Sequence, residues 1–134
     1  MLFRSPGVTL LGHRRDVPEL MRRSDVLVLP SIEEGSALVT AEARASGCVL
    51  AVSDASGALC TPGEDALVHP AGDVETLTEH LVRLGRAPDV LARLRSASLR
   101  TTASFSWPAA GKKLATVYRE FLVTRAPVSA ACAA

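Results

Sequence analysis

The sequence predicts an α/β protein: a partial, Rossmann-like parallel sheet flanked by helices, followed by C-terminal helices. Strand-like apolar runs alternate with helix-like segments through the first two thirds of the chain, and this alternation is typical of parallel sheets. The runs DVLVL and VLAV are continuously apolar, as in strands covered on both faces. A doubly wound domain opens with a strand and a phosphate-binding turn. This chain opens with loop-like residues, so we expect the unit to lack its first half.

The first four expected elements alternate strand and helix. Residues 8–11 (VTLL) are a short apolar run closed by a Gly and predict a buried strand. Residues 16–23 predict a helix, because their leading Asp can cap it and Val, Leu and Met share one face. Residues 25–29 (DVLVL) predict a strand that the following Pro ends. Residues 37–46 then predict a helix that Gly47 terminates.

The remaining elements are two strands and three helices. Residues 49–52 (VLAV) and residues 66–69 are short apolar runs that predict strands, the second ending before a Pro. A Gly-Asp pair places an N-cap before a helix over residues 74–84. Two further helices are expected at residues 88–103 and 108–123, each opening with a Pro.

The length of 134 residues suits one domain or a piece of one. We expect residues 1–123 to form a partial domain and residues 124–134, which are small and weakly patterned, to be a frayed tail. An apolar fraction of 48% is enough for a core. The net charge of +1 indicates no bulk attraction to nucleic acid or to anionic lipid.

The cysteine content and the lack of long apolar segments predict a cytoplasmic protein. The three Cys residues are an odd number without close pairing, so they do not form a disulfide framework and suggest reduced thiols. No apolar run approaches the roughly 20 residues of a membrane helix. The opening residues lack the apolar segment of a signal peptide.

The segment over residues 30–47, PSIEEGSALVTAEARASG, carries the features of a ligand site. It follows the carboxyl end of a strand, where parallel sheets bind their ligands. Gly35 allows close approach of backbone to a ligand. The backbone N–H groups near Ser36, Ala37 and Leu38 open a helix and can attract an anion such as a diphosphate. Glu34 lies beside that group of amides.

Glu42 lies a little more than one turn inside the same helix. Its spacing from Leu38 and Ala45 places the three on one face, which we expect to be the inward face. A carboxylate among small apolar residues needs a partner. The two adjacent hydroxyls of a ribose would suit it; the alternatives are an ion pair with a nearby Arg, such as Arg44, or exposure to solvent.

This segment resembles the signature of family 4 (group 1) retaining glycosyltransferases, in which Pro-Ser, Glu-Gly, a second Glu-Ala and a Gly follow in this order. The segments VTLLG, RRSDVLVLPS, GEDALVHPAGDVETLTEHL and FSWPAAGKKLATVYREF resemble flanking parts of the family, in the right order, over residues 8–123. The resemblance implies the second half of the carboxyl-terminal, donor-binding domain of a GT-B enzyme. Its function would be transfer of a hexosyl group, with retention, from a UDP- or GDP-linked sugar to an acceptor.

By this resemblance, Glu42 would hold the ribose, and His13 and Arg14 would lie near the nucleobase. The residues that would meet the donor sugar and its diphosphate are Glu34, Gly35, Ser36, Ala37, Leu38 and Val39. The resemblance implies no metal, since GT-B enzymes hold the diphosphate with amides and basic side chains, and no cofactor, since the nucleotide sugar is the donor substrate.

The sequence departs from the family pattern in three ways. Ser36-Ala37 stands where Phe-Gly is commoner, and Arg44 stands where Met is usual. The Arg and Lys that neutralise the diphosphate in the family belong to a part that precedes VTLLG. We therefore expect the isolated chain to have little transferase activity. The alternatives are a non-catalytic nucleotide-sugar-binding module and an unrelated α/β interaction domain.

Several further side chains have a structural interpretation beside a functional one. Asp54, Ser56 and Gly57 follow a strand end and are expected either to line the donor cleft or to form a plain loop. The Glu64-Asp65 pair predicts a turn, and Trp107 is expected to pack rather than to bind. The three His residues are too far apart in sequence to predict a metal site. A partial sheet leaves an unpaired edge, where self-association is expected.

Overall fold

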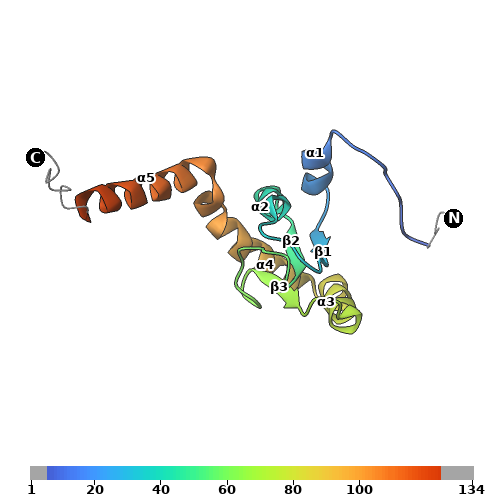
Figure 1. The fold of residues 1–134 in the computed structure, drawn as a ribbon. Helices are drawn as coiled ribbons and strands as arrows, with labels where there is room; N and C mark the ends of the chain where they lie inside the picture. Colours follow the sequence, from blue (N-terminus) through green and yellow to red (C-terminus); the bar gives the residue numbers. More distant parts are fainter. Residues whose placement is uncertain (1–5, 125–134) are drawn as a thin grey trace, which may run out of the picture.

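Three parallel strands form the centre of the molecule, with helices on both faces and a long C-terminal helix that extends away from the body (Figure 1). The computed structural model describes residues 6–124. The strands are β1 (Val26–Leu29), β2 (Val49–Ser53) and β3 (Ala66–His69). The helices are α1 (Val17–Arg22), α2 (Leu38–Ala45), α3 (Val74–Arg86), α4 (Pro88–Thr101), the short 3₁₀ helix η1 (Thr102–Phe105) and α5 (Trp107–Thr124).

The sheet has the order β1-β2-β3, and both pairings are parallel. Val26 pairs with Val49, and Leu50 pairs with Ala66. All five residues of the central strand β2 are buried, as expected for a strand that is covered on both faces. Because parallel strands all end at the same edge, the loops after β1, β2 and β3 lie together.

Two apolar clusters cover the two faces of the sheet. The first joins α1 and α2 to the sheet and includes Met21, Ala43, Cys48, Leu50 and Val52. The second joins α3 and α4 to the opposite face and includes Val49, Leu67, Leu84 and Leu94. The successive residues Val49 and Leu50 belong to opposite clusters, as the period of a strand requires. The sequence prediction of a parallel sheet flanked by helices is therefore confirmed.

Most expected elements are present close to their predicted bounds. The strand at residues 66–69 is found as predicted, and the helix after Asp73 runs two residues further than predicted, to Arg86. The helix expected over residues 88–103 ends at Thr101 and continues as η1. The last helix ends at Thr124, and residues 125–134 of the expected tail lie outside the described residues.

The strand expected at residues 8–11 is wrong. These residues form no strand, and Val8 and Leu10 are 60% and 66% exposed. A strand exists only where a neighbouring strand satisfies its backbone groups, and within residues 6–124 no strand pairs with this segment. The prediction that Asp16 caps α1 is wrong too, because the Asp16 side chain makes no cap hydrogen bond. Its carboxylate instead accepts hydrogen bonds from Arg14.

The expectation that the strand over residues 25–29 is covered on both faces is wrong as well, because Val28 in β1 is 39% exposed. Among the described strands β1 pairs with β2 alone and forms an edge of the sheet.

In the part of the chain that the structure describes, no helix is both long and apolar enough to cross a membrane. Cys48 and Cys60 are free thiols, and burial raises the pKa of both; Cys132 lies outside the described residues.

Candidate functional site

The loop between β1 and α2 starts at the carboxyl end of β1 and carries Glu34 and Gly35. Ser31 donates a hydrogen bond from its hydroxyl to Oε2 of Glu34 at 3.1 Å. The Glu34 N–H donates to the carbonyl of Ala55, in the turn after β2, at 3.0 Å. The Glu34 side chain is exposed. Among residues 6–124 its carboxylate accepts from Ser31, and further acceptor sites face solvent.

The loop leads directly into the N-terminus of α2, which no side chain caps. Ala37 occupies the N-cap position and is buried; it has no side-chain oxygen with which to accept from the first turn. The Thr40 hydroxyl and the Thr40 N–H donate to the Ala37 carbonyl at 2.6 and 2.9 Å, and the Leu38 N–H donates to the Ser36 carbonyl at 3.1 Å. Since no side chain of the described residues caps this end of α2, the positive end of the helix dipole can still attract an anion there.

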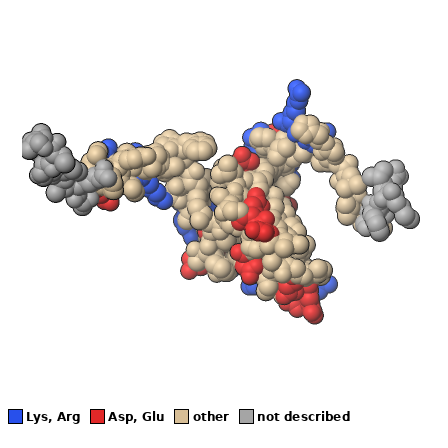
Figure 2. Space-filling model, viewed as in Figure 1, with Lys and Arg blue, Asp and Glu red and all other residues tan. Residues whose placement is uncertain are grey.

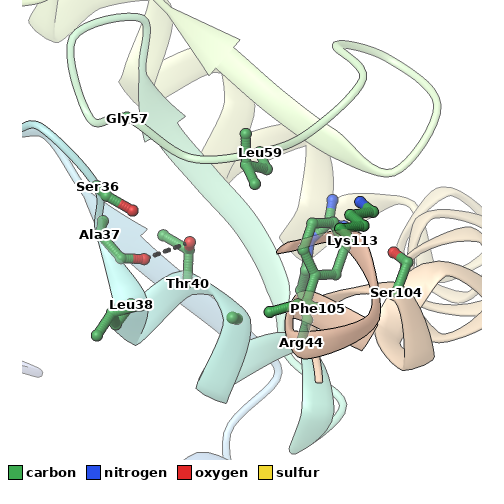
Figure 3. Close-up of a pocket in the computed structure, with 12 residues that line it drawn as sticks. Ser36, Ala37, Leu38, Thr40, Arg44, Gly57, Leu59, Ser104, Phe105 and Lys113 are labelled. Carbon is green, nitrogen blue, oxygen red and sulfur yellow. Dashed lines mark hydrogen bonds between the residues drawn. The ribbon is translucent and has the colours of Figure 1, made fainter. Parts of the chain in front are cut away.

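A hollow of about 230 Å³ opens beside this helix start, between α2 on one side and η1 and α5 on the other (Figure 3). We call it the amide hollow. Its lining includes Ser36, Ala37, Leu38, Thr40, Arg44, Gly57, Leu59, Ser104, Phe105 and Lys113. Figure 3 shows Lys113 and Phe105 across the hollow from Ser36 and Ala37. The hollow thus joins a helix N-terminus to one lysine across a largely apolar floor.

A second hollow of about 360 Å³ lies next to the first, and we call it the Trp107 hollow. Leu38 and Ala41 line both hollows. Glu42, Phe105 and Trp107, which is 82% exposed, line the Trp107 hollow together. A carboxylate near an exposed aromatic ring combines a hydrogen-bond acceptor with an apolar stacking surface.

The orientation expected for α2 is wrong. Its buried residues are Thr40, Ala43 and Arg44, whereas Leu38, on the face expected to be inward, is 63% exposed. The reason is that Ala43 packs in the cluster over the sheet, which turns the opposite face of the helix toward the hollow and the solvent. Glu42 is exposed on that opposite face.

Arg44 does not pair with Glu42. Arg44 is 1% exposed, and its Nη2 atom lies 2.7 Å from Oδ2 of Asp65. Its Nη1 donates to Oγ1 of Thr101 at 3.1 Å, and its guanidinium carbon lies 5.1 Å from the centre of the Phe105 ring. The Nη2–Oδ2 contact is close but not aligned as a hydrogen bond, and Nε is buried without a partner among the described residues.

The predicted site residues separate into three groups in space. Ser36, Ala37 and Leu38 line the amide hollow, and Glu42 lines the Trp107 hollow. Glu34 lines neither hollow, so the two glutamates do not line a common one. Gly35 lies exposed beside Glu34, and Val39 packs half-buried against the core. The ligand roles of these residues remain predictions.

His13 and Arg14 form the third group, in the exposed segment before α1, and line neither hollow. Arg14 is paired with Asp16, with Nε 2.7 Å from Oδ1. This partner raises the pKa of Arg14, and the same hydrogen bond lowers the pKa of Asp16. The proximity of this segment to a nucleobase also remains a prediction.

The sequence analysis missed the C-terminal side of both hollows. Ser104, Phe105 and Lys113 come from η1 and α5, about 70 residues after the motif. The FSW segment marks this region in the sequence, but no periodicity shows that it packs against α2. Asp65, expected in a turn, is also the buried partner of Arg44.

The charge on the surface is distributed in small groups. On the face shown in Figure 2, acidic side chains gather near the middle of the body and at its lower end, and basic side chains lie mainly at its upper end and along the C-terminal helix. No large area of that face has one sign, in agreement with the net charge of +1. Any attraction of an anion at the site is therefore local, through amides and Lys113, rather than a field of the whole molecule.

A parallel sheet with a Gly-containing loop and an uncapped helix at the carboxyl end of a strand is the architecture of a Rossmann-like ligand-binding unit. The family model described as "Glycosyl transferases group 1" matches residues 2–87, which is more than half of the chain. The chain belongs to this family.

Its relatives are glycosyltransferases of different specificities. The chain is 36% identical, over 77 residues, to the UDP-Gal:alpha-D-GlcNAc-diphosphoundecaprenol alpha-1,3-galactosyltransferase of Escherichia coli, and covers 20% of that protein with 56% of its own length. It is 33% identical, over 110 residues, to the D-inositol 3-phosphate glycosyltransferase of Thermobispora bispora, covering 26% of that protein with 78% of its own length. The chain therefore spans about a fifth to a quarter of these relatives.

Solved structures share the fold over most of the chain. Anabaena HepE, determined in complex with UDP-glucose, superposes with a TM-score of 0.74 at 22% identity, over 82% of this chain and 31% of HepE. The sucrose-phosphate synthase of Thermosynechococcus elongatus superposes with a TM-score of 0.68 at 25% identity, over 79% of this chain and 27% of the synthase. Both confirm the GT-B type of α/β fold that the sequence predicts.

Proposed function

We propose that this chain is the donor-binding part of a glycosyltransferase that transfers a hexosyl group from a UDP- or GDP-linked sugar with retention. The observation that carries the proposal is the position of the Glu34–Leu38 segment. It leaves the carboxyl end of β1 and enters the uncapped N-terminus of α2 at the rim of the amide hollow. Two similar proteins support the same donor class: the galactosyltransferase of Escherichia coli is named for UDP-Gal, and HepE was determined in complex with UDP-glucose.

The proposed chemistry assigns the leaving diphosphate to the amide hollow. When the sugar leaves, negative charge grows on the diphosphate, and preorganised donors stabilise the transition state most effectively. The start of α2 directs the positive end of its helix dipole to the rim of this hollow, and Lys113 adds a positive charge to the same hollow. Arg44, although nearby, is engaged by Asp65 and is not proposed to contact the donor.

The two glutamates take different parts of the donor in this proposal. Glu34, with its carboxylate oriented by Ser31, accepts from hydroxyls of the sugar. Glu42, at the rim of the Trp107 hollow, accepts from the ribose hydroxyls. Since the chain spans 20% and 26% of two relatives, the acceptor and its positioning belong to the proposed whole enzyme, and we expect this chain to bind donor without turning it over.

Titration calorimetry of the 134-residue chain with UDP-glucose and with GDP-mannose tests the proposal. We expect one of the two to bind, and Glu42→Gln to weaken that binding about 10- to 100-fold, because hydrogen bonds to charged groups contribute about 1.5–3 kcal/mol. Glu64→Gln, which changes an exposed glutamate of another loop, is the matched control and should bind as the native chain does. Equal affinity of Glu42→Gln and Glu64→Gln would contradict the ribose assignment, and no binding of either nucleotide sugar by the native chain would contradict the proposal.

A further inference from the structure

The turn after β2 holds the loop that carries Glu34. The Ser53 hydroxyl donates to the carbonyl of Ser31 at 2.5 Å, and the carbonyl of Ala55 accepts from the Glu34 N–H at 3.0 Å. These two bonds attach the start and the middle of the β1–α2 loop to the next strand end. The position of the loop is therefore set by its neighbour as well as by its own sequence.

Gly57 completes this contact by close approach of backbone to backbone. A Cβ atom at position 57 would lie 2.8 Å from the Gly35 carbonyl oxygen and 2.9 Å from that of Glu34. Such distances are not tolerated between a side chain and main-chain atoms. Of the nine glycines in the chain, Gly57 alone has any atom within 4 Å of such a Cβ. The absence of a side chain at this position lets the two loops touch.

The turn over residues 53–57 also has internal contacts that hold its own backbone. Ser53 and Ser56 are buried, and the Ser56 hydroxyl donates to the Ser53 carbonyl at 2.6 Å. Gly57 has a φ of +63°, a conformation that glycine adopts without strain. Figure 3 places Gly57 on the same side of the amide hollow as Ser36 and Ala37. The turn thus lies beside the part of the loop that leads to the helix start.

The same contacts reach the Glu34 carboxylate. Ser31, whose carbonyl is held by Ser53, donates its hydroxyl to Glu34 Oε2. A movement of the turn would therefore move both the backbone and the side chain of Glu34. A displacement of a binding side chain of this kind lowers affinity in sites whose groups are held in place before the ligand binds.

We propose that the turn over residues 53–57 is a positioning element for the donor, and that Gly57 is its most sensitive residue. The turn sets the position of the Glu34–Gly35 backbone, and therefore the point at which the Glu34 carboxylate meets the sugar. The proposal rests on the proposed function for the ligand, whereas the coupling between the two loops rests on the contacts alone.

The test compares Gly57→Ala with Gly63→Ala. Both glycines have positive φ, +63° and +78°, so each substitution carries backbone strain, but nothing lies within 4 Å of a Cβ at position 63. We expect Gly57→Ala to shift the amide resonances of Glu34, Gly35 and Ser36, and to weaken UDP-glucose or GDP-mannose binding tenfold or more. Binding of bare UDP or GDP should weaken as well, but by a smaller factor, because Gly57 lines the amide hollow assigned to the diphosphate, whereas only the full donor also loses the contact of Glu34 with the sugar. Gly63→Ala should leave the resonances and both affinities within twofold.

A second pair of variants covers the case in which Gly57→Ala does not fold. Ser53→Ala removes a buried hydroxyl that bonds the loop, whereas Ser98→Ala removes a buried hydroxyl without a partner in the described part of the chain. We expect only Ser53→Ala to move the Glu34 and Gly35 amides. If neither Gly57→Ala nor Ser53→Ala moves these amides more than its control does, the positioning proposal is overturned. If the amides move but the native chain binds neither nucleotide sugar, the coupling stands and the proposed function fails.

Discussion

Arg44 shows how a single residue can connect three parts of the molecule. It lies in α2, pairs with Asp65 in the loop before β3, donates to Thr101 at the end of α4, and stacks on Phe105 in η1. The ion pair is almost fully buried. Charges in such positions are stable only as pairs, because removal of one partner leaves the other desolvated.

We expect Arg44→Met to lower the free energy of unfolding by about 3–5 kcal/mol, since it leaves the Asp65 carboxylate buried and unpaired. Urea denaturation followed by circular dichroism measures the change. The control is the double variant Arg44→Met/Asp65→Asn, which removes both charges and should recover a large part of the loss. A double variant whose loss equals the sum for the two single variants would contradict a direct interaction.

His80 is a second residue whose environment has a measurable consequence. Its ring lies with its centroid 6.3 Å from that of His69, at the end of β3. Burial is the largest effect that lowers the pKa of His80, and the charges of His69 and Arg83 lower it further, against the opposing effect of Glu79 and Asp73. The folded state therefore disfavours the protonated form of this side chain.

The sign of the pH dependence follows from this shift. The unfolded chain binds a proton at His80 near the ordinary value of about 6.5, whereas the folded chain binds it only at lower pH, so stability falls as the pH decreases through that window. We expect the urea midpoint to be lower at about pH 5.5 than at about pH 7.5, and His80→Gln to reduce this difference. His13→Gln, which changes an exposed histidine before α1, should retain the native dependence. A His80→Gln variant with the native pH dependence would rule out this assignment.

At the scale of the elements, Asp73 illustrates a prediction from sequence that the structure confirms. It occupies the N-cap of α3, and its Oδ1 accepts from the Thr76 N–H at 2.9 Å. This hydrogen bond is also the main reason that the pKa of Asp73 is lowered. The cap matters for the fold because α3 supplies Leu84 to the cluster beneath the sheet.

Replacement of the cap should destabilise α3 and the domain with it. We expect Asp73→Ala to lower the melting temperature by about 3–8 °C, from the usual contribution of an N-cap, and Asp73→Asn to lower it less. Asp89→Ala is the matched control, since Asp89 lies in the first turn of α4, a helix without a side-chain cap. Equal melting temperatures for Asp73→Ala and Asp89→Ala would show that the cap contributes nothing.

The errors at this scale have a common cause. Residues 8–11 have the composition of a strand but no neighbouring strand among residues 6–124, and α2 presents to the hydrophobic core the face opposite to the one expected. A local pattern describes what a segment can do, whereas pairing and packing depend on what lies beside it. Gly57 is a similar case, because only the folded backbone shows that it touches Gly35.

At the scale of the whole molecule, α5 extends away from the body (Figure 1). Along it, Leu114, Val117, Tyr118 and Leu122 are exposed, and their spacing of three and four residues places them on one face. A continuous apolar stripe on a surface promotes association.

We therefore expect concentration-dependent self-association, measured by sedimentation velocity. Leu114→Lys/Val117→Lys should weaken it strongly, because it places charge in the middle of the stripe. Thr116→Lys, on the polar side of the same helix, is the matched control and should not. If the double variant associates as the native chain does, the α5 interface is refuted, and the unpaired edge of β1, predicted from the sequence, becomes the next surface to test.

The sequence by itself determined the parallel α/β class, the three described strands, the Asp73 cap and the family signature. Each of these depends on local patterns: apolar runs, capping residues, and the order of Pro-Ser, Glu-Gly and the second Glu. Only the tertiary structure decided the rest: that Arg44 pairs with Asp65 rather than with Glu42, that Lys113 and Phe105 close the amide hollow, and that Gly57 supports the Glu34 loop. The physical reason is that these arrangements bring together residues between 21 and 77 positions apart, and such pairs are selected by packing and desolvation, which no single segment encodes.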